Sequence, residues 1–387
     1  MKEIMKELDR LSKQRVSELQ KAKKSGKLVI QYTGNFIPEE MIKAAGAEPY
    51  LMCRGGEPEP PDAVLEDMLR FMNPLARSMA GFNELGLDPV TPISDLIVMQ
   101  QTDCHVGRIS ELFEFQELPV WKIGVPSEWK KEIAFEYYVR SLEKFKEKLE
   151  EMTGNPLDKE VFKNELEKTN KLHEALRKID SLRKKENPPI GLTEFIRLNH
   201  YSFTVDKDIM TEKLNELYDK LKDAPGKFNE NSPKILFCGR ALAIGDYTVP
   251  RLLEESGGVI VSDFMDEGIR PYRNDYTINE DPLLSFAKTA YLERPPINIF
   301  QPAWEDRFEY MKGLIKDYDV DGVVWYQLSF DEIYDMEYTV LAKWMGELNI
   351  PIIKMESSYE YSREAMGPLT TRIESFVESL KGAYENE

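Results

Sequence analysis

The stretch Leu28-Val-Ile-Gln-Tyr-Thr-Gly-Asn-Phe-Ile-Pro-Glu-Glu-Met-Ile-Lys-Ala-Ala-Gly-Ala-Glu-Pro-Tyr-Leu-Met-Cys53 decides the fold that we expect. Two largely apolar runs, 28–32 and 49–53, enclose a segment with helix start signals. Asn35 can cap this helix, Pro38 suits its first turn, and Glu39 and Glu40 complement the positive end of its dipole. A strand, a helix and a strand in this order predict a parallel pair. A helix start can also bind an anion or a carbonyl group, although ordinary capping explains the same residues.

The alternation continues along the chain and resumes after a long helical region. We expect further strands at 96–99, 120–125, 235–238, 259–262, 298–300, 322–326 and 350–355. We expect helices at 1–25, 138–152, 159–185, 249–256, 281–291, 304–318, 337–347 and 369–384, and a Pro-rich surface loop at 57–62. The charged faces of the helical region are typical of solvated surfaces. The prediction is an α/β protein with two doubly wound parallel-sheet domains, 1–131 and 233–387, and a helical insertion with linker at 132–232.

The composition is that of a globular protein without general affinity for polyanions. The 387 residues are 42% hydrophobic and include 51 basic and 69 acidic residues, a formal net charge of −18. This charge disfavours nucleic acid and anionic membranes as partners, although a local basic pocket for a phosphorylated ligand stays open. Because we find neither a signal-type apolar region nor a membrane-length apolar run, we expect a cytoplasmic protein. Three separated cysteines, Cys53, Cys104 and Cys238, predict neither a disulfide framework nor a four-cysteine zinc site.

A polar cluster follows the strand expected at 96–99, in Ile97-Val-Met-Gln-Gln-Thr-Asp-Cys-His-Val-Gly-Arg108, and a helix is expected from Ile109. Ligands of open α/β sheets bind at the carboxyl ends of strands, so this cluster is a candidate site. Cys104 beside His105 suggests a nucleophile or a metal site. Adjacent side chains rarely meet on one ligand, however, and a lone cysteine is usually a small buried apolar residue.

Three further segments place polar groups at expected strand or helix ends. Asn73 and Pro74 form the cap and first position of a helix, in which Arg77 could bind a carboxylate or phosphate or pair with a structural acid. After the strand at 322–326, several oxygen-bearing side chains could bind a metal or cap the next helix: Ser329, Asp331, Glu332 and Asp335. The segment 235–247 has two glycines after a strand but lacks the GxGxxG spacing, so NAD is not predicted.

Taken in order, these segments resemble the 2-hydroxyacyl-CoA dehydratase family, which also includes benzoyl-CoA reductase subunits, and they are most similar to its smaller dehydratase subunit. The resemblance is carried by 37–47, 73–78, 97–108, 234–261, 281–283, 320–337, 350–356 and 371–374. It implies two α/β domains and a heterodimer with a homologous subunit. It also implies a 4Fe–4S cluster in the complex and an ATP-dependent iron–sulfur activator that supplies an electron. The activity implied is radical elimination of water from a 2-hydroxyacyl-CoA thioester, in anaerobic metabolism.

The chain departs from this family at the cluster ligands. Typical subunits use three cysteines at three strand ends, and the equivalent positions here are Asn73, Asp103 and Asp331, with Cys104 one place beyond the second. An ordinary three-cysteine cluster cannot form, because clusters need soft thiolates and these oxygens are hard ligands. Cys104 could supply one thiolate if the loop shifts by a residue. Otherwise the pocket holds a hard cation between the two aspartates, or hydrogen bonds alone, or two carboxyl groups of which one has a raised pKa.

The resulting hypothesis is a lyase subunit whose homologous partner carries the cluster, with no certain cofactor in this chain. The resemblance suggests Asn35, Glu40, Asp103 and Asp331 as catalytic residues, and the following as substrate-binding residues: Arg77, Arg108 and Tyr326. The alternatives are a benzoyl-CoA reductase-like subunit, a cluster-less protein that binds or assembles acyl-CoA thioesters, and a redox-independent lyase that uses Asp103 and Asp331 as acid and base.

Overall fold

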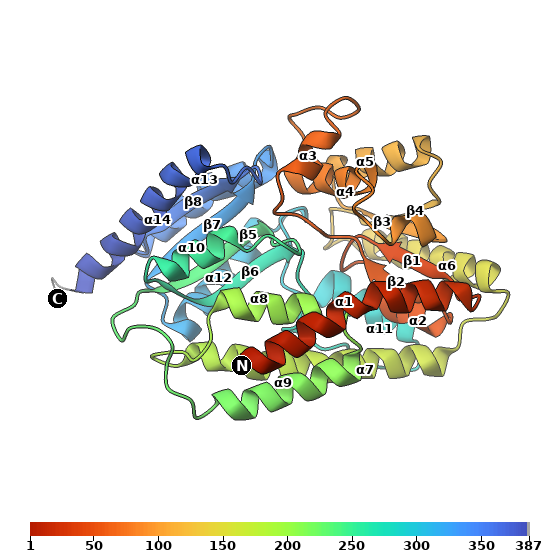
Figure 1. Ribbon diagram of the computed structural model, residues 1–387, viewed down its shortest axis with the longest axis horizontal. Helices are drawn as coiled ribbons and strands as arrows, with labels where there is room; N and C mark the ends of the chain where they lie inside the picture. The colour runs from red at the N-terminus through yellow and green to blue at the C-terminus, as the bar shows by residue number, and fades with distance from the viewer. Residues whose placement is uncertain (385–387) are drawn as a thin grey trace.

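The structure, a computed structural model that describes residues 1–384, contains two four-stranded parallel sheets (Figure 1). The first has the order β2-β1-β3-β4, with β1 Val29–Tyr32, β2 Glu48–Leu51, β3 Leu96–Gln101 and β4 Val120–Gly124. The second has the order β6-β5-β7-β8, with β5 Lys234–Ala241, β6 Val259–Glu267, β7 Gly322–Leu328 and β8 Ile352–Ser357. The two sheets therefore repeat one topology, and the predicted class of two doubly wound parallel sheets is confirmed.

Helices flank both sheets and fill the region between them in sequence. Those of the first part are α1 Lys2–Lys24, α2 Glu39–Ala44, α3 Glu59–Ala63, α4 Pro74–Glu84 and α5 Cys104–Phe115. Those of the middle part are α6 Glu132–Thr153, α7 Lys159–Ser181, α8 Leu192–Tyr201 and α9 Lys207–Leu221. Those of the last part are α10 Thr248–Glu255, α11 Pro282–Lys288, α12 Trp304–Tyr318, α13 Glu332–Glu347 and α14 Arg363–Tyr384. Within residues 1–384, no helix is both long and apolar enough to cross a membrane.

The middle helices connect the two sheets. In Figure 1, α7 and α9 run along the lower side of the molecule, beneath the red and orange first sheet and the cyan and blue second sheet. Helix α7 contacts α2, beside the first sheet, and it also contacts α8, which packs against β6 of the second sheet. One apolar core extends through both sheets and these helices. This packing holds the two sheets in a defined orientation, so that groups at their strand ends can meet.

Two predicted elements are wrong for identifiable reasons. The strand expected at 298–300 is a turn. The backbone amide of Asn298 donates to the Asp266 carboxylate at 2.9 Å, and the Asn298 side chain donates to Glu337, so this backbone is not available for a strand ladder. The Pro-rich segment 57–62 is not an exposed loop throughout, since α3 begins at Glu59 and Pro60 and Pro61 are buried. Packing decides both segments: contacts with residues distant in sequence fix the turn at 298–300, and α3 packs against α4.

Several boundaries also differ from the prediction, and the differences affect the site. Strands β5 and β6 extend to Ala241 and Glu267, beyond the expected ends at 238 and 262. Helices begin earlier than expected, α5 at Cys104, α13 at Glu332 and α14 at Arg363. Asn35 does not cap α2, whose N-cap is Pro38; instead, the Asn35 side chain donates to the Ile269 carbonyl at 2.8 Å.

Candidate functional site

The candidate site lies where the strand order of both sheets reverses. Each order has a switch point, between β1 and β3 in the first sheet and between β5 and β7 in the second, and ligands of such sheets bind at these points. Asp103 follows β3 and caps α5. Arg240 lies near the end of β5, and Asp331 follows β7 and precedes α13. The structure therefore brings together side chains from both switch points.

The Arg240 guanidinium is the centre of this cluster. Arg240 is only 4% exposed, and it donates from Nη1 to Asp331 Oδ1 at 2.8 Å and from Nη2 to Asp103 Oδ2 at 2.6 Å. Its Nε lies 3.6 Å from Glu267 Oε2. Asn73 Nδ2 donates to the same Asp331 oxygen at 2.6 Å. We call these five residues the Arg240 network. The cation between the two aspartates is thus a side chain of the protein itself.

Helix capping orients two members of the network. Asn73 Oδ1 accepts from the amides of Leu75 at 2.8 Å and Ala76 at 3.3 Å, which confirms the predicted cap of α4 and leaves Nδ2 for Asp331. Asp103 Oδ1 likewise accepts from two amides at the start of α5 and leaves Oδ2 for Arg240. A cap fixes the side chain because it satisfies amides that have no partner within the helix. Each residue therefore presents one polar atom to the helix and one to the network.

The carboxyl groups of the network have opposite pKa shifts. Burial alone would raise the pKa of Asp103, but the charge of Arg240 and the Val106 amide lower it below its usual value. Burial raises the pKa of Asp331, which Arg240 and Asn73 offset only in part. Burial also raises the pKa of Glu267, to about 7, against the charge of Arg240. The network thus combines a fixed cation, an ionised Asp103 and a Glu267 that can exchange a proton near neutral pH.

Glu267 also lines a small cavity between the two sheets. This cavity, of about 10 Å³, is bounded by the ends of β1, β2, β3 and β6, and Asn35, Gln100 and Arg294 contribute polar groups. Its size suits about one water molecule. Among the residues suggested as catalytic from the sequence, Asp103 and Asp331 are therefore in the network, and Asn35 lines the adjoining cavity.

The other predicted site residues make contacts outside the network. Buried Glu40 accepts from Thr169 Oγ1 at 2.6 Å and from Lys207 Nζ at 3.0 Å, on the side of the middle helices. Buried Arg77 donates to the Pro61 carbonyl at 3.0 Å and the Met72 carbonyl at 3.2 Å, where it holds the segment before α4 in place.

Arg108 and Tyr326 likewise have partners of their own. Arg108 is exposed and pairs with Glu111 one turn along α5. Tyr326 is buried in β7, and its hydroxyl donates to Asp246 at 2.6 Å. A substrate would have to displace these partners to engage either side chain.

Cys104 does not complete a metal site. It is exposed at the first residue of α5, so the expectation of a buried cysteine is wrong there and right for Cys53 and Cys238. Among residues 1–384, no group of three or more His, Cys, Asp or Glu side chains is arranged to hold a metal ion. The metal ligand suggested at this position therefore has no partner ligands in the described part of the chain.

Sequence reasoning missed Arg240, Glu267 and Arg294. The segment Lys234-Ile-Leu-Phe-Cys-Gly-Arg-Ala-Leu-Ala-Ile contained the signal for Arg240, because an arginine inside an otherwise apolar run indicates a buried charge that needs a partner. The interpretation of this run rested on its glycine spacing alone. Glu267 had no comparable signal, because β6 was expected to end at 262.

Comparison with known proteins agrees with this architecture. The family model for the D-component of 2-hydroxyglutaryl-CoA dehydratase matches residues 35–380. The beta subunit of (R)-2-hydroxyglutaryl-CoA dehydratase of Acidaminococcus fermentans is 23% identical over 389 residues, 97% of this chain and 99% of that protein. One subunit of the benzoyl-CoA reductase of Thauera aromatica is 20% identical, and the match covers 91% of each chain. The (R)-phenyllactyl-CoA dehydratase beta subunit of Clostridium sporogenes is 23% identical over 67% of each.

Fold and site together define an α/β protein with a polar centre between two parallel sheets. The chain belongs to the 2-hydroxyglutaryl-CoA dehydratase D-component family. The predicted family resemblance is thereby confirmed, and the chain is a member of a group of dehydratase-like subunits.

Proposed function

We propose that this chain is a subunit of a 2-hydroxyacyl-CoA dehydratase-like complex in which a homologous partner carries the 4Fe–4S cluster. The proposed reaction is the radical elimination of water from a 2-hydroxyacyl-CoA, with an electron from an ATP-dependent iron–sulfur activator. Three relatives named as subunits of dehydratases or a reductase support a subunit role. The observation that carries the proposal is the Arg240 network at the three positions where the family resemblance expects cluster ligands.

The residues at these positions do not fit an iron–sulfur cluster. Asn73, Asp103 and Asp331 offer one amide and two carboxylates, whereas iron–sulfur clusters require thiolates. Arg240 donates hydrogen bonds to both carboxylates, at 2.8 and 2.6 Å, and thereby engages the oxygens that a metal would need. The Asn73 oxygen is engaged by the start of α4. The proposal therefore assigns this chain no step that passes through a cluster of its own.

In this proposal the residues of the chain bind, orient and move protons. Arg240 holds Asp103 and Asp331 in fixed positions at the end of β5. Glu267, with a pKa of about 7, can accept or donate a proton at the cavity that Asn35 also lines. Such a group suits a reaction in which a hydroxyl leaves as water, because the leaving oxygen must gain a proton.

A redox-independent lyase is the second candidate, because the pKa shifts of Asp103 and Asp331 are opposite in direction. Carboxyl groups whose environments push their pKa values apart are a common arrangement of acid and base. In this alternative Asp103 stays ionised while the more buried Asp331 holds the proton. Asp331 Oδ2 has no hydrogen-bond partner among the described residues, as expected of an oxygen that can carry a proton.

The test is anaerobic production of the chain alone and together with three-cysteine family members from the same genome. We expect a stable heterodimer with one such homologue, absorbance near 400 nm in the complex, and iron and labile sulfide only where the homologue is present. Stoichiometric iron and sulfide in the chain alone would overturn the assignment of the cluster to the partner. Failure of every such homologue to associate would overturn the subunit role. Dehydration of 2-hydroxyacyl-CoA by the chain alone would favour the redox-independent lyase.

A further inference from the structure

Arg294 is a buried arginine that forms no ion pair with any residue of the described range 1–384. It is 8% exposed, and its Nη2 donates to the backbone carbonyl of Asp266 at 3.3 Å. Its Nε and Nη1 have no hydrogen-bond partner among the described residues. Burial lowers the pKa of Arg294, but an arginine stays protonated in proteins. A full positive charge is therefore held between the sheets with N–H groups left to donate.

The other deeply buried arginines in this region are all paired. Arg270 donates to Glu39 at 3.0 Å, and Arg307 contacts Asp266 at 2.7 Å and Glu337 at 2.6 Å. The side chain of Asp266 already accepts from Arg307 on one oxygen and from the Asn298 amide and the Tyr334 hydroxyl on the other. The charges of Asp266 and Glu267 act on Arg294 without forming an ion pair with it, and its guanidinium carbon lies 5.1 Å from the centroid of the Phe36 ring. Since a buried charge without a directly bonded partner is unfavourable, an anion that contacts Arg294 would be stabilising.

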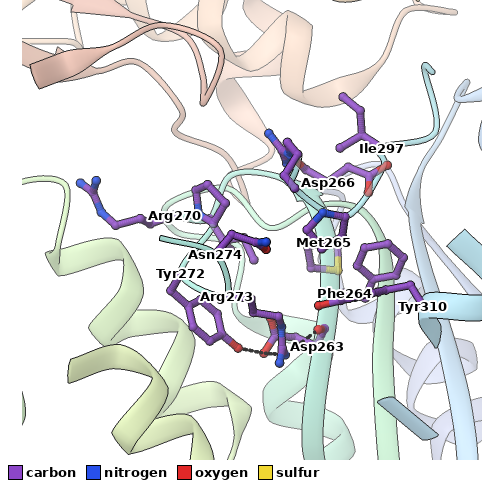
Figure 2. Close-up of a pocket in the computed structure, with 14 residues that line it drawn as sticks. Asp263, Phe264, Met265, Asp266, Arg270, Tyr272, Arg273, Asn274, Ile297 and Tyr310 are labelled. Atoms are coloured by element: carbon purple, nitrogen blue, oxygen red, sulfur yellow. Dashed lines mark hydrogen bonds and ion pairs between the residues drawn. The ribbon is translucent and has the colours of Figure 1, made fainter. Parts of the chain in front are cut away.

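Arg294 lines two cavities. One is the cavity of about 10 Å³ that Glu267 and Asn35 share. The other, of about 40 Å³, lies beside the last residues of β6 (Figure 2). Figure 2 shows Tyr272 and Arg273 on one wall of this second cavity and Phe264 and Tyr310 on the opposite wall.

The lining of the larger cavity restricts what can bind there. Its walls include the apolar side chains of Phe264, Met265, Ile269 and Ile297. Four other charged residues line it, and each is paired with another group of the chain: Asp263, Asp266, Arg270 and Arg273. A space of about 40 Å³ exceeds the requirement of a single water and admits a group of a few atoms, but not a nucleotide. The features that a ligand must match are one negative charge, small size and a short apolar part.

We propose that Arg294 anchors a binding site for the carboxylate of a short-chain organic acid, in the larger cavity beside the last residues of β6. Guanidinium groups bind carboxylates through charge-assisted hydrogen bonds, and Nε and Nη1 have donors left for them. The apolar wall then contacts the carbon chain of the acid. This inference concerns a ligand site and stands independently of the proposed reaction.

The test measures binding of acetate, propionate and butyrate to the full-length protein, by thermal stabilisation and by the linewidth of ¹³C-labelled acetate at constant ionic strength. We expect saturable binding to the wild type and at least tenfold weaker acetate binding to Arg294→Met. Arg294→Lys, which keeps the charge but replaces the planar guanidinium fork by an ammonium group with fewer N–H donors, should be intermediate. The matched control Arg140→Met removes an exposed arginine of α6 and should bind acetate like the wild type.

Three results would overturn the proposal. The first is the absence of saturable binding of any of the three acids to the wild type. The second is equal stabilisation by chloride or inorganic phosphate, which would indicate a non-selective anion site. The third is unchanged acetate binding in Arg294→Met. If Arg294→Met does not fold, Ile297→Phe reduces the larger cavity without altering the charge, and unchanged acetate affinity in that variant would equally contradict the proposed location.

Discussion

Replacing Arg240 by methionine tests whether the network is an obligatory ion-pair centre. Methionine approximates the length of the arginine stem but removes the cation that contacts Asp103, Asp331 and Glu267. Loss of one partner from a buried ion pair costs about 3–5 kcal/mol, because the remaining charge is left uncompensated. With three carboxyl groups around the site, we expect the upper part of this range at pH 8.

The effect should depend on pH in a defined direction. Without Arg240, the pKa of Asp103 loses the largest of the influences that lower it, so we expect all three carboxyl groups to have raised pKa values in the folded variant. A carboxyl group whose pKa is higher in the folded than in the unfolded state stabilises the fold at low pH. This contribution is lost as the pH rises through the pKa of the folded state. The loss of stability in Arg240→Met should therefore be clearly smaller at pH 5 than at pH 8.

The assay is urea unfolding of both proteins at pH 5 and pH 8, followed by tryptophan fluorescence and circular dichroism. Arg140→Met is the control for loss of an exposed arginine and should lie within about 0.5 kcal/mol of the wild type. Combining Arg240→Met with Asp103→Asn and Asp331→Asn should recover part of the stability, because the unpaired charges are removed. A loss below about 1 kcal/mol at pH 8, or an equal loss at both pH values, would refute the reasoning.

Variants at three further positions test other parts of the structure. Asn73→Ala removes the cap of α4 and should lower the free energy of unfolding by about 1–2 kcal/mol, as measured with urea. Asn73→Asp keeps a capping oxygen but places a carboxylate beside Asp331. The loss of stability in Asn73→Asp should therefore be larger at pH 8 than at pH 5. Glu267→Gln removes a group whose folded pKa is about 7, so the decline in stability as the pH rises from 5 to 8 should be shallower than in the wild type; an unchanged slope would contradict this assignment. Gly239→Ala would place a Cβ 1.7 Å from the Tyr326 carbonyl oxygen, at a φ of +147° that is unfavourable for alanine, so the variant should unfold at a lower urea concentration than the wild type. An unchanged unfolding midpoint would disprove this close contact of β5 and β7.

Local signals in the sequence were sufficient for much of the fold. Alternating apolar runs and helix patterns predicted all eight strands of the two sheets, and the largest boundary difference is at β6, which ends at Glu267 and not at 262. The cap at Asn73 was correct because an asparagine followed by proline forms its bonds with amides two and three residues ahead. The same reasoning was wrong at Asn35, where the amide side chain instead reaches Ile269, which is 234 positions away.

The sequence by itself determined the fold class, the family resemblance and the three positions, Asn73, Asp103 and Asp331, where that resemblance leads us to expect cluster ligands. These features depend on local periodicity and on residue identity. Only the tertiary structure decided what lies between Asp103 and Asp331. Arg240 is 137 positions from Asp103 and 91 from Asp331, and it reaches both because the two switch points face each other and β5 continues past its expected end. The partner of a buried charge depends on the packing of whole sheets, and no local pattern in a single sequence specifies that packing.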